Sequence, residues 1–170
     1  GRTVPLLRDV ANDLGLRDLF PDDLRDLATS NFEAAYSQLS ERGSDRVGEI
    51  DDAVRRHFQD LELPLDATLY DVLVLALRGK DAIFTFNWDP FLAQACQRLH
   101  AAGVRPDELP QLYFLHGNVA IGACPDRHEV GPVALSCSEC GERYHPTRLL
   151  YPVEHKNYED GQFIEHEWKS

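Results

Sequence analysis

Residues 81–103, DAIFTFNWDPFLAQACQRLHAAG, decide the expected fold. The apolar run at 82–86 is rich in aromatic and branched residues and too short for an ordinary helix, so it predicts a buried strand. A helix should begin at Pro90, because Asp89 can cap it and proline suits the first helical position. Gly103 can take the left-handed conformation that ends such a helix.

Asn87 and Asp89 therefore lie where a strand ends and a helix begins. Open parallel sheets bind ligands at the carboxyl ends of their strands, near free backbone N–H groups and positive helix ends. A second buried strand, QLYFLHGNV at 111–119, ends at His116 and Gly117. A carboxamide can orient water, a carboxylate can accept from ribose, and histidine can take a proton from a sugar hydroxyl. The alternative stays open that Asp89 only caps the helix and His116 only ends the strand.

The remaining chain supplies helices before this region and an irregular insert after it. An S-x-x-E spacing at Ser30 and Glu33 predicts a capping box, and Asp66 is the expected cap of a helix at 68–79. Residues 148–156 read as a strand-like run, and 162–170 as the beginning of a helix. The predicted helices are 4–14, 21–28, 31–41, 48–60, 68–79 and 90–102. This order predicts an α/β fold with a partial parallel sheet and flanking helices, of which about three strands are visible.

Length, net charge and hydropathy limit the classes of protein to which this chain can belong. The 170 residues, 43% hydrophobic, suffice for one domain with a sizeable core. A net charge of −12 argues against nucleic-acid binding, and no apolar run is long enough for a membrane span. The chain has no methionine, so we expect a fragment or a processed piece. A homo-oligomer is compatible with the sequence, which does not specify one.

The insert at 120–146 holds a candidate metal site. A C-x2-C pair followed by Gly141 forms a knuckle that can aim two thiolates at one ion, and zinc takes four ligands in a tetrahedron. With three cysteines available, a histidine must complete the set; His128 is preferred and His145 is the alternative. The candidate ligands are Cys124, His128, Cys137 and Cys140. Free thiols without metal are the competing interpretation. Clustered cysteines of this kind predict a reducing, cytoplasmic setting.

Two short motifs resemble those of a known family. T-F-N-W-D at 85–89 is similar to the T-x-N-x-D segment of sirtuins and their bacterial sirtuin-like relatives, and F-L-H-G at 114–117 to the strand-end histidine motif. Both occur in the family order and are followed by a cysteine-bearing insert. L-L-Y-P-V with Lys156, Tyr158 and Trp168 resembles the stretch that follows in the bacterial proteins. The resemblance covers residues 66–168.

The resemblance implies NAD chemistry on a Rossmann-like fold with a zinc-ribbon-like insert. Residues 1–119 and 147–170 would be parts of an incomplete NAD-binding domain, and 120–146 the zinc module. His116 and Asn87 would be catalytic, and the residues that contact NAD would be Thr85, Asn87, Asp89 and Gly117. Hydrolysis of NAD, as in bacterial anti-phage defence, is favoured over protein deacylation, and a non-catalytic zinc-ribbon interaction module is the alternative from another class.

The chain also departs from the family pattern. No glycine-rich phosphate loop or G-x-S segment is found, and Phe86 stands where sirtuins commonly have glutamine. The second cysteine of the first zinc pair is missing. This chain alone is therefore expected to be inactive.

Overall fold

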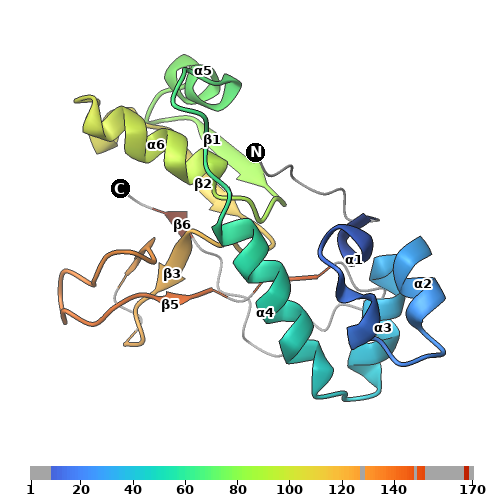
Figure 1. The fold of residues 1–170 in the computed structure, drawn as a ribbon. Coiled ribbons are helices and arrows are strands. Elements are labelled where there is room, and N and C mark those ends of the chain that lie inside the picture. Colours follow the sequence, from blue (N-terminus) through green and yellow to red (C-terminus); the bar gives the residue numbers. More distant parts are fainter. Residues whose placement is uncertain (1–8, 127–128, 148, 152–166, 169–170) are drawn as a thin grey trace. The chain divides into compact units, whose positions relative to one another are not determined.

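Two compact units make up the chain in the computed structural model, which describes residues 9–126, 129–147, 149–151 and 167–168 (Figure 1). The first unit comprises Gly1–Asp60 and Leu150–Phe163, and the second comprises Leu61–Leu149 and Ile164–Ser170. Both predicted parts of the NAD-binding domain are thus divided between the units. None of the described helices is long and apolar enough to cross a bilayer.

The first unit is helical in its described part. Its elements are α1 (Val10–Asp13), η2 (Leu16–Leu19), α2 (Arg25–Ser30), α3 (Phe32–Glu41) and α4 (Arg46–Gln59). Large apolar side chains from these elements and from the residue after η2 are fully buried: Phe20, Phe32, Leu39, Ile50 and Val54. Residues 4–8 of the first predicted helix lie outside the described residues.

The predicted capping box of α3 is wrong at its first residue. Asn31, not Ser30, is the N-cap, and its side-chain oxygen accepts a hydrogen bond from the Ala34 N–H. Ser30 is the last residue of α2, and its hydroxyl donates to the main-chain oxygen of Asp26. Ser30 therefore belongs to α2, although the spacing had predicted it as the cap of α3.

The Tyr151 ring packs against α3 of the first unit. It stacks on Tyr36 with ring centroids 4.2 Å apart, and the Tyr36 hydroxyl donates to Asp51 over 2.7 Å. Burial is the main cause that raises the pKa of Tyr151. Residues 149–151 are not in a strand, so the strand-like prediction for 148–156 is wrong there; 148 and 152–156 lie outside the described residues.

The second unit holds a three-stranded sheet in the order β1-β2-β6. Its strands are β1 (Ala82–Thr85), β2 (Gln111–Phe114) and β6 (Glu167–Trp168), and its helices are α5 (Leu69–Ala76), α6 (Phe91–Ala101) and the short η3 (Pro106–Glu108). β1 and β2 are parallel, as predicted, with Ala82 opposite Gln111. β6 pairs antiparallel with β2, so the helix predicted over 162–170 is wrong at 167–168. The chain is thus mixed α/β with a small parallel pair.

Among the described residues, one face of β1 is covered and the other is exposed, which corrects the prediction of a buried strand. The residues that alternate inward along the pair, Ile83, Leu112 and Phe114, pack with the apolar sides of α5 and α6. Phe84 on the other face is 62% exposed and stacks on Tyr113 with centroids 4.6 Å apart. A parallel sheet that is apolar on both faces is normally covered on both; helices of the described residues cover one.

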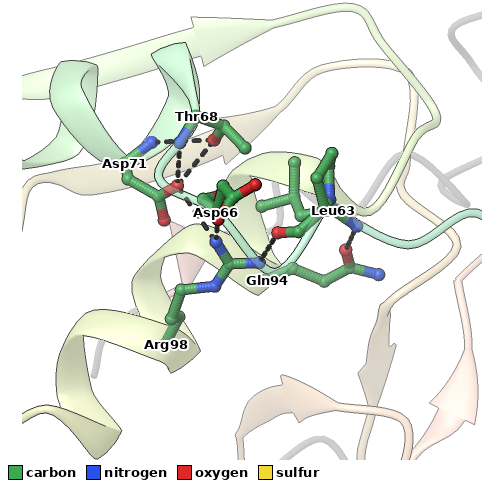
Figure 2. Close-up of polar contacts among 7 residues, drawn as sticks. Leu63, Asp66, Thr68, Asp71, Gln94 and Arg98 are labelled. Carbon is green, nitrogen blue, oxygen red and sulfur yellow. Dashed lines mark hydrogen bonds and ion pairs between the residues drawn. The ribbon is translucent and has the colours of Figure 1, made fainter.

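Thr68 caps α5 in place of the predicted Asp66. Its hydroxyl oxygen accepts from the Asp71 N–H, and the Asp71 carboxylate accepts from the Thr68 N–H, which makes a complete capping box. Arg98 of α6 reaches Asp71 over 3.2 Å and also donates to the main-chain oxygen of Asp66 (Figure 2). The loop before α5 is therefore fixed to α6.

The insert forms a second sheet of its own. Its strands are β3 (Ile121–Ala123), β4 (Val130–Pro132) and β5 (His145–Pro146), antiparallel in the order β4-β3-β5. Glycines make this close packing possible: a Cβ at Gly122 would lie 2.7 Å from the main-chain oxygen of His145. The predicted insert is therefore a separate small sheet within the second unit.

Candidate strand-end site and metal centre

Main-chain hydrogen bonds join the loops that follow β1 and β2. The Leu115 N–H donates to the Thr85 oxygen over 2.9 Å, and the Val119 N–H donates to the Trp88 oxygen over 3.1 Å. Since the two strands are parallel neighbours, their carboxyl ends lie at one edge of the sheet. The loops that carry Asn87, Asp89 and His116 are thereby held side by side.

The Asn118 side chain connects the loops that follow β1 and β2, and it was not among the residues predicted from the sequence. It is fully buried; its Nδ2 donates to the main-chain oxygen of Asp89 over 2.6 Å, and its oxygen accepts from the Ala120 N–H over 2.9 Å. Thr147 donates to the Asn118 main-chain oxygen over 3.3 Å. The available signal was a polar residue directly after Gly117 in an otherwise apolar run.

Asp89 is buried at the start of α6, with 6% of its surface exposed. Its carboxylate accepts from the Phe91 N–H over 3.2 Å, so it satisfies one donor of the first helical turn. The predicted cap positions are wrong by one residue, because Pro90 is the N-cap and the helix begins at Phe91. Burial raises the pKa of Asp89, and burial followed by the charge of Asp89 raises the pKa of Tyr70. At the other end of the helix, Gly103 has the expected positive φ of 100°.

Asn87 differs from Asp89 in being exposed. The Thr85 hydroxyl oxygen accepts from its N–H over 3.1 Å, which fixes the backbone of the turn and leaves the carboxamide at the surface. Gly117 ends the facing strand in a turn with φ of 76°, and its N–H donates to Phe114 over 3.0 Å. An exposed amide beside a rigid turn is available to a ligand.

His116 is half-buried and lies edge-on to Phe86, with ring centroids 4.8 Å apart and planes at 65°. Phe86 itself is 61% exposed. Phe86, which stands where sirtuins commonly have glutamine, is thus the residue whose ring contacts His116. The predicted NAD-site residues thus have their backbones at one edge of the sheet, at the carboxyl ends of β1 and β2. Their side chains differ in exposure.

The second candidate site is the cysteine cluster of the insert. The Sγ atoms of Cys124, Cys137 and Cys140 all lie within 4.8 Å of one another, and those of Cys124 and Cys140 are 3.5 Å apart. His145 is exposed on β5 and does not belong to this group, and His128 lies outside the described residues. Three sulfur donors that face one point fit the preference of a borderline-soft cation such as zinc.

Local backbone bonds place each thiol. Cys124 follows β3, and its N–H donates to the Glu129 oxygen over 2.9 Å, which extends the β3–β4 hairpin. Cys137 donates to the Glu142 oxygen over 2.8 Å and accepts from the Gly141 N–H over 3.0 Å. Gly141 has the positive φ of 77° that closes the knuckle predicted from C-x2-C-G. The second pair of ligands is therefore set by a short local turn.

Cys140 is the thiol of the cluster whose pKa is shifted. The Glu142 N–H lowers the pKa of Cys140, but burial and the neighbouring thiols of Cys124 and Cys137 raise it to about 11 overall. Binding of a metal ion by this thiol would therefore release its proton. The Tyr144 hydroxyl and the Ser138 N–H lower the pKa of the adjacent Glu129 to about 2.

Comparison of the chain with protein families, with curated proteins and with solved structures found no match.

Proposed function

We propose that the chain carries part of a sirtuin-like NAD-consuming site at the carboxyl ends of β1 and β2, supported by a zinc-bound insert. The observation that supports it most is the parallel pairing of these strands, which brings the T-F-N-W-D and F-L-H-G motifs to one edge of a sheet. Ligands of open α/β sheets bind at such an edge.

The proposed roles are those that the resemblance to sirtuins implies, and the exposure of Asn87 supports the role of that residue. His116 would take a proton from a ribose hydroxyl, and Asn87, with its amide at the surface, would orient the attacking water or the nicotinamide ribose. Asp89 would accept from the nicotinamide carboxamide. Thr85 and Gly117 would contact the nucleotide through the turns they form. Water would replace nicotinamide on the ribose carbon, giving nicotinamide, ADP-ribose and a proton.

The proposed metal is zinc, held by Cys124, Cys137, Cys140 and a fourth ligand, for which His128 remains the predicted residue. Zinc with four protein ligands would hold the insert together and take no part in the reaction. The insert supports this role because its three strands are only two or three residues long.

NAD turnover by the full-length product of the gene tests the proposal. His116→Ala and Asn87→Ala should each lower NAD consumption by at least about tenfold, whereas His100→Ala, an exposed histidine on α6, should leave it unchanged. Equal turnover by all four proteins would contradict the proposed roles. Nicotinamide release that requires an acyl-lysine peptide would identify a deacylase in place of a hydrolase.

A non-catalytic zinc module is the second candidate, favoured by the convergence of the three thiols. It predicts one zinc per chain and no NAD binding by the full-length protein. Calorimetry with NAD separates the two proposals.

A further inference from the structure

We propose that Glu129 is a positioning residue for the metal site, acting with Tyr144 to align the two segments that carry the cysteines. This inference rests on the proposed binding of a metal by Cys124, Cys137 and Cys140, and it does not depend on NAD chemistry.

Glu129 is fixed by its backbone opposite the first ligand. Its main-chain oxygen accepts from the Cys124 N–H, one step beyond the pair formed by Ala123 and Val130. Glu129 therefore belongs to the hairpin that carries Cys124, and its position is set by the β3–β4 ladder.

The carboxylate of Glu129 reaches the other segment. One of its oxygens accepts from the main-chain N–H of Ser138, which lies between Cys137 and Cys140. The same oxygen accepts from the Tyr144 hydroxyl over 2.7 Å. A single carboxylate oxygen thus connects the hairpin of Cys124 to the knuckle that holds the other two thiols.

Tyr144 packs against two glycines of the insert and against two of the cysteines. It is buried and packs with Cys124 and Cys137. A Cβ at Gly131 would lie 2.6 Å from its ring, and one at Gly122 would lie 2.9 Å from its Cβ. Since both strands leave room for this side chain, the tyrosine is part of the folded insert and can hold Glu129 in place.

This arrangement has the chemistry of groups that orient metal ligands. Residues that hydrogen-bond around a metal site fix the ligands, and their loss typically lowers metal affinity about 10–100-fold. The carboxylate oxygen described here accepts from Ser138 and Tyr144, and the Cys137 side chain also hydrogen-bonds to Glu129. Glu129 therefore lies where a group that orients the thiols would lie.

Titration of the whole chain with Co²⁺, followed by competition with Zn²⁺, tests the inference. Glu129→Ala should weaken Co²⁺ binding about 10–100-fold and change the ligand-field bands of the bound cobalt. Glu129→Gln keeps an acceptor oxygen and should recover most of the affinity. Tyr144→Phe keeps the ring on its glycines, loses one donor and should fall between the two, which tests the contact even if the alanine variant does not fold. Asp126→Ala, which removes an exposed carboxylate of the same insert, is the control and should match the parent chain.

Three results would overturn the inference. Parent-like affinity and spectra in both Glu129→Ala and Tyr144→Phe would show that the clamp does not position the ligands. A glutamine variant as weak as the alanine variant would show that charge, and not hydrogen-bond geometry, is responsible. Absence of thiolate-to-cobalt bands in the parent chain would reject the metal site itself, and the inference with it.

Discussion

The cysteine cluster and the strand-end site are built in opposite ways. In the insert, three chemically equivalent side chains converge on one point, and a short turn and a hairpin place them. At the strand ends, the backbones converge while the side chains differ: Asn87 is exposed, Asp89 is buried and His116 lies against Phe86.

The two sites differ in the sequence separation between the residues that form them. The knuckle needs only residues 137–142, whereas the hydrogen bond from Asn118 to Asp89 joins residues 29 positions apart. A site made by local turns is visible in sequence spacing. A site made by distant strand pairing depends on buried groups that spacing does not reveal.

The largest expected effect is the loss of metal by the insert. Cys137→Ser with Cys140→Ser should lower zinc affinity by more than about a hundredfold and reduce amide protection of β3–β5, because metal-binding energy is folding energy in such modules. Metal analysis and hydrogen exchange measure this. Cys96→Ala, which removes a buried thiol of α6 outside the cluster, should retain one zinc. A double serine variant that still binds zinc tightly would reject the ligand set.

Replacing Asn118 and Asn87 separately should distinguish a structural asparagine from one that is available to a ligand. Asn118→Ala would leave the Asp89 oxygen and the Ala120 N–H unpaired in a buried region, at a cost of about 3 kcal/mol in the free energy of unfolding. Asn87→Ala, at an exposed position, should change it by less than about 0.5 kcal/mol. Urea unfolding compares the two. Similar losses would mean that the exposed amide also has a structural role.

The glycine under Tyr144 provides a smaller test of the insert. Gly131→Ala would press a methyl group against the ring and should lower stability by about 1–3 kcal/mol. Gly48→Ala, within α4 and with no neighbour within 4 Å, should raise stability by about 0.5–1 kcal/mol. Thermal unfolding, with metal content measured in parallel, reports both. A stable Gly131→Ala protein would show that the ring can move away.

The smallest effect concerns Asp89. Burial raises its folded-state pKa, so the stability gained by protonating it is present at acid pH and is lost as pH rises through the folded pKa. Asp89→Asn keeps an acceptor for the Phe91 N–H and should be more stable than the parent at pH 7. The advantage should shrink as pH falls towards about 4, the unfolded value. An advantage that grows on acidification would contradict the assignment. Such a costly buried carboxylate is typical of a functional position.

Interpretation of the local sequence succeeded where the physical signal lies within a few residues. The helix after Pro90 ends at Gly103, the C-x2-C-G turn closes at Gly141, and a strand precedes Asn87. The predicted helix N-caps were wrong where two nearby residues could each act as the cap. Asn31 and Thr68 cap the helices assigned to Ser30 and Asp66, because the first-turn N–H groups donate to the side-chain oxygen that the path of the backbone brings within reach.

Sequence by itself therefore determined the strand and helix on either side of Asn87, the parallel order of β1 and β2 and the three cysteines that meet in the insert. Tertiary structure alone decided which face of β1 is covered, that Asn118 joins the loops, that the segment at 167–168 pairs as a strand and that Glu129 connects the two halves of the insert. The physical reason is that hydrophobic periodicity and turn residues act over a few positions. Burial of a polar group can be balanced only by a partner that folding brings to it.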